Sequence, residues 1–252
     1  LEVEEDVEEQ VRIELLQVES ESGSVELSGE QPRILIYHTH TTEAYRPTDE
    51  APYEQTSRWR TNDEQNNIVR VGEELAQLLR ERYGIAVLHD TTNHEPPRLG
   101  TAYERSVKTM EDYLREYPSI ELMIDVHRDA YELSDEAAME DYAKADDAVE
   151  VEGKRCARLM FVVGTGQGKT GAGFSVKPNY PVNYALALAL TEHMSAKSER
   201  LMRPIRVKTG RYNQHVGKRC LLVEVGHNAN TLEEALNSIP YLAEAIAAAS
   251  AS

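Results

Sequence analysis

The most chemically specific motif of the chain contains His38, His40 and Glu43 within six residues. It begins one residue after the apolar run 34–36, which has the composition of a buried strand. Ligands in open α/β sheets bind at the carboxyl ends of the strands, so the motif lies where a functional site is expected. Imidazole and carboxylate groups at this spacing can bind one zinc ion, provided that a third ligand comes from elsewhere and one position stays open for water.

Other apolar runs also carry polar residues. His127 follows the run 120–126, and Glu224 lies within the run 221–225. A charged glutamate is costly to bury without a partner, so its position indicates a functional carboxylate. A single histidine is more often an ordinary surface or core residue, but the combination favours a metal site. Asp125 is expected to orient a histidine rather than to bind the metal.

The composition is that of an acidic globular protein. The chain has 252 residues, of which 40% are hydrophobic, and this is enough for one sizeable core in one or two domains. The net charge of -17 argues against nucleic acid as a partner, because phosphate contacts need clustered lysine and arginine. Cys156 and Cys220 are too few for a disulfide framework and are expected to be small core residues.

The beginning of the chain differs from the rest. Residues 1–30 contain 11 acidic groups and a single basic one. We therefore predict an acidic arm or linker over residues 1–31 and a catalytic domain over residues 32–252. A second acidic stretch, near residues 131–152, is expected to be a surface insertion that can cover the site. No signal peptide or membrane span is recognisable, and because the chain begins at Leu1 we expect it to be part of a longer protein.

Apolar strands alternate with amphipathic helices after the arm. The pattern predicts strands over residues 33–37, 85–89, 120–126, 159–163 and 220–225, and helices over 66–82, 103–117, 183–197 and 231–249. The last helix is predicted either as one helix or as two, broken near Pro240. Continuous apolar strands separated by helices are typical of an α/β fold with a mostly parallel central sheet and helices on both faces.

The segment 164–170 looks like a phosphate-binding loop, because it follows a strand and ends in Gly-Lys-Thr. Such a loop needs four residues between its first glycine and the Gly-Lys pair, whereas only three separate Gly164 from Gly168. The glycine- and proline-rich stretch 171–178 is also not expected to form the helix that should follow. We therefore predict a loop bordering a substrate groove and no nucleotide site.

Six separated motifs together resemble the stage II sporulation protein P family. They are residues 34–45, 67–72, 89–94, 125–130, 211–214 and 222–226, in the family's order, within a resemblance that runs from about residue 33 to 247. The family is similar to a branch of the zinc-dependent N-acetylmuramoyl-L-alanine amidases. The resemblance thus implies a zinc amidase/carboxypeptidase-like fold, zinc as cofactor, and cleavage of cell-wall peptidoglycan during engulfment of the forespore.

Partners and a location also follow from the resemblance. Family members are anchored in the membrane through a segment ahead of the catalytic domain, which is not part of this chain. They act outside the cytoplasmic membrane, in the space between the mother-cell and forespore membranes. The expected partners are stage II sporulation proteins D and M, and the expected substrate is peptidoglycan.

Matching the motifs residue by residue implies roles for the candidate residues. His40 and His127 match the histidine ligands of zinc, and Glu224 matches the catalytic glutamate. Two glutamates compete for the carboxylate ligand. Glu64 fits the general amidase pattern, whereas Glu43 fits the His-x-x-Glu spacing of zinc carboxypeptidases. We favour Glu43, because its spacing needs no inserted loop to bring the two ligands together.

The remaining candidates are substrate contacts. His38 and Arg128 are expected to contact carbonyl or carboxylate groups of the substrate. Thr41 and Thr42 depart from the wider amidase family, which has glycines there. In the expected reaction, zinc activates a water molecule and polarises the amide, and Glu224 moves the proton to the leaving amine. The alternatives are a zinc carboxypeptidase acting on peptides and a non-catalytic wall-binding module, and the amidase could also cut stem-peptide crosslinks.

Overall fold

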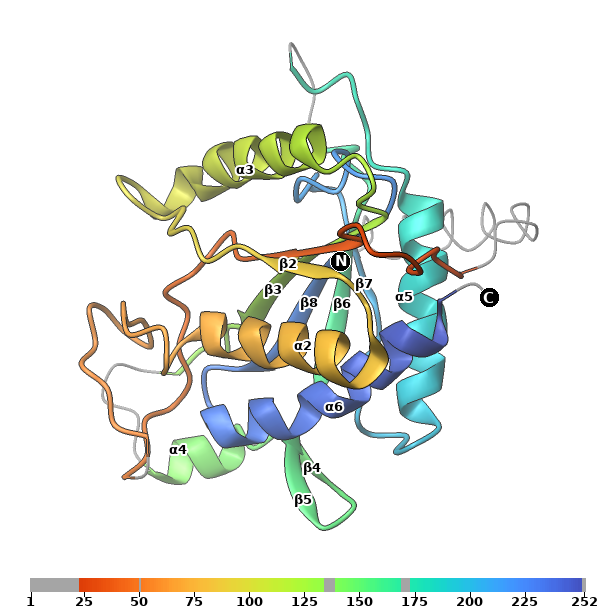
Figure 1. Ribbon diagram of the computed structural model, residues 1–252. Helices are drawn as coiled ribbons and strands as arrows, with labels where there is room; N and C mark the ends of the chain where they lie inside the picture. Colours follow the sequence, from red (N-terminus) through yellow and green to blue (C-terminus); the bar gives the residue numbers. More distant parts are fainter. Residues whose placement is uncertain (1–22, 50, 134–138, 169–172, 251–252) are drawn as a thin grey trace.

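The computed structural model describes residues 23–49, 51–133, 139–168 and 173–250. A six-stranded sheet in the order β2-β1-β3-β8-β6-β7 forms its centre (Figure 1). The strands are β1 (Ile34–Tyr37), β2 (Val87–His89), β3 (Leu122–Asp129), β6 (Leu159–Gly164), β7 (Arg206–Lys208) and β8 (Cys220–His227). Only the β6–β8 pair is antiparallel among the neighbours in this sheet. The predicted α/β fold with a mostly parallel sheet is therefore confirmed.

Helices cover both faces of the sheet (Figure 1). They are α2 (Ile68–Tyr83), α3 (Ala102–Glu116), α5 (Tyr180–Ser195) and α6 (Leu232–Ala248), together with the short α4 (Met139–Lys144) and the 3-10 turn η1 (Leu99–Thr101). One large apolar cluster joins α2, α5 and α6 to one face, and a smaller cluster joins α3 to the other. The sheet is thus buried on both faces, as its continuous apolar runs require.

The side chains of β1 show how the two faces are filled. Ile34 and Ile36 belong to the large cluster under α2, whereas Leu35 and Tyr37 pack with Met110 of α3. Successive side chains of a strand point to opposite faces, so an uninterrupted apolar run is the pattern of a strand covered on both sides. The loop that follows β1 therefore begins inside the core.

The face under α3 becomes polar toward the carboxyl ends of β3 and β8. Met123 and Cys220 still belong to the apolar cluster of this face. Residues two and four positions further along a strand point to the same face, which places Asp125, His127 and Glu224 there. His127 and Glu224 are also direct neighbours in the strand register. The sheet thus brings the candidate residues of two distant segments side by side.

Local signals set both ends of α2. The side chain of Asn67 accepts a hydrogen bond from the Val69 N–H at 2.9 Å and caps the first turn. Gly84 follows the last turn in the left-handed conformation, with φ of 68°, which glycine adopts without strain. The predicted end of this helix at Gly84 is confirmed.

Of the two predictions for the last helix, the unbroken one is observed. α6 runs as a single helix with Pro240 inside it. A capping box between Thr231 and Glu234 sets its start, and Ile239 and Leu242 bury its inner face. A proline inside a helix costs about 3 kcal/mol. The burial of this helix against α2, α5 and the sheet outweighs that cost.

Several short elements were not predicted from the sequence. They include α4, η1 and β7, which are too short to show a period. They also include a hairpin of β4 (Ala148–Val151) and β5 (Lys154–Ala157), whose turn residues Glu152 and Gly153 have φ of 51° and 78°. β4 lies in the predicted acidic insertion, where charged residues hide the strand pattern. Closure of this insertion over the site stays a prediction, and residues 134–138 lie outside the described residues.

Part of the predicted arm belongs to the core. Val25 is paired with Ser250 in a parallel bridge, and both Val25 and Leu27 are buried in the large apolar cluster. The acidic arm stays a prediction for residues 1–22, which lie outside the described residues. Within the described ranges, none of the helices has the length and apolar character needed to cross a membrane.

Both cysteines are buried free thiols, as predicted. Cys156 lies in the large cluster and Cys220 in the cluster under α3. Burial raises the pKa of the Cys220 thiol to about 12, so this thiol stays protonated and unreactive. The cysteines therefore act as small core residues.

Candidate functional site

His40, Glu43 and His127 lie close together at the carboxyl ends of β1 and β3. The imidazole rings of His40 and His127 are 5.4 Å apart between centroids and nearly perpendicular, at 89°. Glu43 Oε2 lies 3.6 Å from His127 Nδ1. The structure thus brings together the three residues that the sequence proposed as metal ligands.

Backbone hydrogen bonds hold the loop that carries His40 and Glu43. The Glu43 carbonyl accepts a hydrogen bond from the Ile68 N–H at 2.8 Å, which ties the loop to the start of α2. The hydroxyl of the buried Tyr45 donates to the Val225 carbonyl at 2.8 Å, which ties the loop to β8. The candidate ligands are therefore placed by rigid elements on both sides.

The buried carboxylate of Asp125 orients the His127 ring. It accepts hydrogen bonds from the Thr39 N–H at 2.8 Å and the Thr39 hydroxyl at 2.6 Å, and it lies 2.9 Å from His127 Nε2. Burial opposes ionisation, but His127 and Thr39 hold the pKa of Asp125 below its usual value. Because Asp125 engages Nε2, the Nδ1 atom of His127 faces Glu43.

Three carboxyl groups, those of Asp125, Glu43 and Glu224, influence the charge of His127. Burial by itself lowers the pKa of an imidazole, but Asp125, Glu43 and Glu224 together raise the pKa of His127 to about 10. A positive charge is thus strongly favoured at this point of the sheet, and a proton on His127 supplies it here. A metal ion offers the same charge and competes with that proton, since only the neutral imidazole binds metal.

Glu224 is the neighbour of His127 in the strand register and is only partly exposed. Burial raises the pKa of its carboxyl to about 8, against the opposing charge of His127. Its Oε2 atom is buried and has no hydrogen-bond partner among the described residues. Buried polar atoms are nearly always paired, so this atom indicates a functional rather than a structural role.

The donor atoms of the cluster suit zinc, which binds imidazole nitrogen and carboxylate oxygen. His40 Nδ1 is buried and has no hydrogen-bond partner in the described part of the chain. The described ranges contain no group of three or more His, Cys, Asp or Glu side chains that could hold a metal ion as they stand. The donors therefore fit zinc by type and location, and side-chain rotation is needed to close them around the ion.

Arg60 and Glu95 lie beside the candidate ligands and were not identified from the sequence. Arg60 Nη2 lies 3.4 Å from Glu43 Oε1, and Arg60 Nη1 lies 2.6 Å from Glu95 Oε1. Glu95 Oε1 in turn lies 3.8 Å from His40 Nδ1. Arg60 lies in the long loop between β1 and α2, far from any apolar run, and Glu95 lies in the loop after β2, just beyond the family motif 89–94, so no spacing singled out either residue. Arg60 shares its single positive charge between Glu43 and Glu95 in this arrangement.

Two tyrosines form an aromatic wall at the site. Tyr103 of α3 is stacked on His127, with 6.5 Å between centroids and 12° between planes, and meets His40 edge-on at 5.7 Å. Tyr212 meets Tyr103 at 5.9 Å. Tyr212 and Asn213 have φ of 44° and 53°, a strained backbone for residues other than glycine. The sequence marked Tyr103 only as the start of the predicted helix 103–117, whereas Tyr212 lies in one of the family motifs.

The glycine-rich segment 164–168 offers no phosphate cradle. Its backbone N–H groups at residues 164, 165, 166 and 168 donate to Gln214 Oε1 and to the carbonyls of Lys208, Gly210 and Thr209. A phosphate loop needs these N–H groups for its ligand. α5 begins only at Tyr180. The described part of this loop therefore agrees with the prediction of no nucleotide site, and residues 169–172 lie outside it.

His38 is completely buried, with 0% of its surface exposed. Its Nδ1 donates to the Val126 carbonyl at 3.0 Å, and its Nε2 lies 2.9 Å from His89 Nε2. Burial lowers the pKa of His38 to about 3, so the ring is neutral. This placement argues against the predicted contact between His38 and substrate, because both ring nitrogens are engaged inside the protein.

Gly72 of α2 provides the space for these rings, which leads to a testable expectation. A Cβ atom on Gly72 would lie 2.6 Å from His38 Nε2 and 2.8 Å from His89 Nε2. We expect Gly72→Ala to lower the free energy of unfolding by about 1–3 kcal/mol, although alanine favours helices. The control is Gly100→Ala, because a Cβ atom at this position would have no atom within 4 Å. Measured by denaturant unfolding, the control should change the free energy of unfolding by less than about 0.5 kcal/mol. Equal stability of both variants would contradict the expectation.

Arg128 is also committed to the interior. Its guanidinium donates to the carbonyls of Ala44 at 2.8 Å, Trp59 at 2.9 Å and Asp129 at 3.2 Å. Its backbone N–H donates to Glu43 Oε2 at 3.1 Å. These contacts argue against the predicted role in substrate binding. Arg128 instead positions the loop and the carboxylate of Glu43.

Glu64, the alternative carboxylate ligand, lies elsewhere. It is exposed and lines a hollow of about 300 Å³ with His89 and residues of α2, and none of the three candidate ligands lines that hollow. Glu43, by contrast, is 6% exposed and lies beside His127. Of the two competing glutamates, the structure therefore places only Glu43 at the cluster.

Two of the solved structures that are similar in backbone fold are amidases. The N-acetylmuramoyl-L-alanine amidase from Clostridium difficile 630 has a TM-score of 0.46 and 13% identity, covering 88% of this chain and 95% of that one. The catalytic domain of CwlV, N-acetylmuramoyl-L-alanine amidase from Bacillus (Paenibacillus) polymyxa var. colistinus, has a TM-score of 0.45 and 13% identity, covering 86% and 95%.

At the level of sequence, the family described as Stage II sporulation protein P (SpoIIP) matches residues 2–247. A curated relative, Stage II sporulation protein P of Bacillus subtilis (strain 168), is 28% identical over 218 residues, which are 82% of this chain and 48% of the relative. The chain thus spans about half the length of that relative. Because the family match extends over nearly the whole sequence, the chain belongs to the stage II sporulation protein P family.

Proposed function

We propose that this chain is a zinc-dependent hydrolase of peptidoglycan, which cleaves the amide between N-acetylmuramic acid and the stem peptide. The observation that carries the proposal is the meeting of His40, Glu43, His127 and Glu224 at one edge of the sheet. Two imidazoles, one carboxylate and a second, protonatable carboxyl are the groups that a zinc hydrolase needs. Membership of a sporulation family supports the cell wall as the place of action.

In this proposal His40, Glu43 and His127 hold the metal. Zinc, when bound, lowers the pKa of a bound water and polarises the carbonyl of the scissile amide. The chain's own contribution is to present the ligands: Asp125 fixes the His127 ring, and the Arg128 N–H fixes the Glu43 carboxylate. Release of Glu43 from Arg60 makes this carboxylate available.

Glu224 moves the proton in the proposed reaction. It accepts a proton from the attacking water at Oε2 and delivers it to the nitrogen of the leaving peptide. A carboxyl with a pKa of about 8, raised by burial, can hold and release a proton near neutral pH. Met160 is its register neighbour on β6, and such apolar neighbours keep water away from the carboxyl.

The choice of the carboxylate ligand can be tested by metal affinity. Loss of a residue that only orients a metal ligand weakens metal binding by roughly 10- to 100-fold. We expect Glu43→Gln to weaken zinc binding by more than this, because Glu43 is a proposed ligand. Glu64→Gln should change the affinity less than about twofold, since Glu64 is exposed in another hollow. Competition with a chelator measures both values. The reverse order would make Glu64 the ligand.

A zinc carboxypeptidase has less support. It needs a cation beside the metal for the terminal carboxylate of its substrate. Arg128 is engaged with three backbone carbonyls, and Arg211 lines a separate hollow. Arg60, a further cation beside the cluster, is paired with two carboxylates. Cleavage of stem-peptide crosslinks by the same centre remains compatible with the proposal.

The decisive experiment is mass spectrometry of purified peptidoglycan digested with the zinc-loaded chain. An amidase releases stem peptides with a new amino terminus and leaves a free lactyl carboxyl on the glycan. A carboxypeptidase releases single amino acids, and an endopeptidase separates crosslinked peptides. Binding to peptidoglycan without any released product, in a sample that contains zinc, would identify a wall-binding module and overturn the proposal.

We also propose a location and partners for the longer protein. Peptidoglycan lies outside the cytoplasmic membrane, so an enzyme that cuts it acts there, and family membership supports the space between the mother-cell and forespore membranes. A membrane anchor ahead of this domain and binding to stage II sporulation proteins D and M complete the proposal. Co-purification from sporulating cells tests the two partners.

A further inference from the structure

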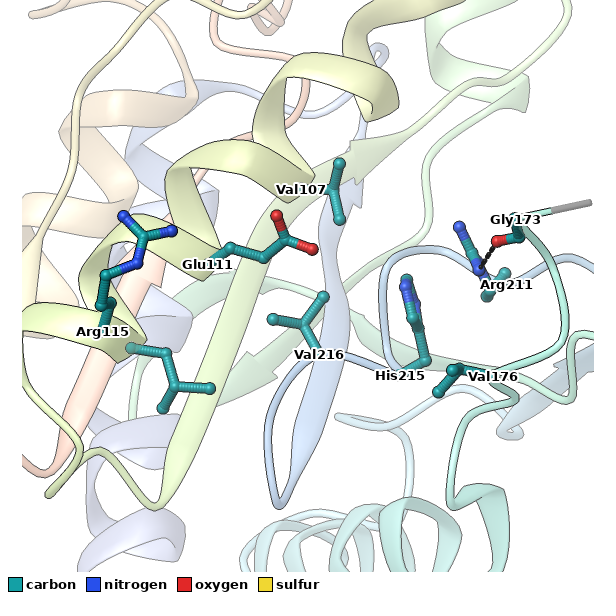
Figure 2. Close-up of a pocket in the computed structure, with 9 residues that line it drawn as sticks. Val107, Glu111, Arg115, Gly173, Val176, Arg211, His215 and Val216 are labelled. Carbon is teal, nitrogen blue, oxygen red and sulfur yellow. Dashed lines mark hydrogen bonds between the residues drawn. The ribbon is translucent and has the colours of Figure 1, made fainter.

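A hollow of about 640 Å³ lies along α3, and none of the proposed zinc ligands lines it (Figure 2). We call it the α3 hollow. Its lining consists of Val107, Glu111, Leu114 and Arg115 of α3, Gly173 and Val176 of the segment before α5, and Arg211, His215 and Val216 of the segment before β8. It therefore combines charged groups with aliphatic side chains.

The α3 hollow continues the face of α3 that forms the aromatic wall. Tyr103, Val107, Glu111 and Leu114 recur every three or four residues and therefore share one face of the helix. Tyr103 contacts the two proposed histidine ligands. With a rise of 1.5 Å per residue, Glu111 lies about 12 Å further along the helix. On the opposite wall, Arg211 directly precedes Tyr212 of the aromatic wall.

Opposite charges enter the α3 hollow from its two walls. Figure 2 shows Glu111 and Arg211 on opposite sides, with Val216 and His215 between them. Burial lowers the pKa of the Arg211 guanidinium, and the charge of Glu111 partly offsets this effect. The two groups are thus within electrostatic reach, yet among the described residues they form no ion pair with each other. The space between them can admit a ligand that carries both charges.

The cationic wall is held in place before any ligand binds. Arg211 Nη1 donates to the Gly173 carbonyl at 2.9 Å, and the guanidinium lies 4.6 Å from the centre of the Phe174 ring. His215 Nδ1 is buried without a hydrogen-bond partner in the described part of the chain. Burial and the nearby Arg211 lower the pKa of His215 to about 4, so the ring adds hydrogen-bonding capacity but no charge.

We propose that the α3 hollow binds an amino-acid head group, an ammonium and a carboxylate on one carbon, at the end of an aliphatic chain. Arg211 takes the carboxylate, Glu111 takes the ammonium, and Val107 and Val216 pack against the chain. The proposal rests on the proposed function in one respect: the head group belongs to the stem peptide of the substrate. An extended peptide spans up to about 3.5 Å per residue, so a side chain on the third residue from the cleaved amide reaches the hollow.

The test uses three small probes on the metal-free chain, because amino-acid head groups also bind zinc. 2,6-Diaminopimelate carries the proposed head group at both ends of an aliphatic chain, pimelate carries only carboxylates, and cadaverine carries only ammonium groups. We expect NMR titration to show diaminopimelate binding about five- to tenfold more tightly than either control probe. The shifted resonances should be those of Glu111, Arg211 and Val216.

Two variants separate the charges. Glu111→Gln should remove the preference for diaminopimelate over pimelate, and Arg211→Gln should remove the preference over cadaverine. Arg211→Lys keeps the charge and should retain part of the binding. Arg82→Gln is the matched control, because Arg82 lies 5.5 Å from the Tyr83 ring on exposed α2 surface. Circular dichroism checks that each variant is folded.

Equal binding of all three probes to the unmodified chain would overturn the proposal, and so would unchanged preferences in folded Glu111→Gln and Arg211→Gln. The result is independent of catalysis, because no turnover is measured. If the preferences are as expected but peptidoglycan is not cleaved, the proposed function fails and the binding site stands. If peptidoglycan is cleaved but the probes show no preference, only the binding site fails.

Discussion

Replacement of Glu224 by glutamine is expected to lower the release of stem peptides by about 10²- to 10⁴-fold, while the fold and the zinc content stay unchanged. Glutamine has nearly the shape of glutamate but cannot accept a proton from water. Because Glu224 is partly exposed and its Oε2 has no hydrogen-bond partner among the described residues, the substitution breaks no contact that holds the sheet. The effect should therefore lie in the rate and not in stability.

Mass spectrometry of timed digests measures this rate, and metal analysis of the same sample measures zinc. Glu192→Gln, on the exposed surface of α5, is the matched control and should keep the full rate. A Glu224→Gln chain that releases stem peptides at nearly the original rate would show that Glu224 is a structural carboxyl. Glu95, the other carboxylate near His40, would then be the next candidate for the base.

Loss of zinc is the expected result of His40→Ala and of His127→Ala. Each change removes one of three proposed protein ligands. The affinity for zinc should therefore fall by more than the roughly 10- to 100-fold that is lost when a residue orienting a ligand is removed. His127→Ala should also lower the melting temperature, since it leaves Asp125 and Glu43 without the positive charge between them. His40 has no such central position among carboxylates, so His40→Ala tests metal binding with less effect on folding.

The control for both changes is His193→Ala, because His193 lies on the surface of α5 beside Glu244, at 3.3 Å. Zinc content after dialysis and competition with a chelator report the affinity, and thermal unfolding reports the stability. If both alanine variants keep zinc as tightly as the unmodified chain, the metal does not bind at this cluster. If only His40→Ala keeps zinc, Glu95 becomes a candidate to replace it as a ligand.

The elements that carry the site could be predicted because each is a local pattern. The run 34–36 has no polar residue, as expected for a strand buried on both faces, and Gly84 ends a helix that shows a 3.6-residue period. β7 and the hairpin of β4 and β5 could not be predicted. β7 is short and forms by pairing with β6, which is distant in the sequence. The strands of the hairpin are short and charged, and each pairs with the other, so neither shows a periodic pattern.

The residue types and their spacing pointed to a metal site near residues 38–43, 127 and 224, and the resemblance to the family then singled out His40, His127 and Glu224. Each stands at or near the end of an apolar run, and parallel strands place such ends at one edge of a sheet. The choice between Glu43 and Glu64 could be argued from spacing alone. Of the two glutamates, the structure places only Glu43 beside His127. The backbone N–H of Arg128, the next residue on β3, donates to the Glu43 carboxylate and holds it there.

The direction of each side chain was decided by the tertiary structure. His38 and Arg128 belong to the same motifs as the ligands, but His38 turns inward to His89 and Arg128 turns to the carbonyls of Ala44 and Trp59. A strand position determines the face on which a side chain lies, whereas its partners depend on which loops pack there.

Arg60, Glu95 and the α3 hollow likewise arise only in three dimensions. They are formed by loops and helix faces from distant parts of the chain, which no periodicity or spacing connects. Glu111 and Arg211 face each other across that hollow because α3 packs on the sheet beside the segment before β8. Only this packing brings their opposite charges close enough to interact.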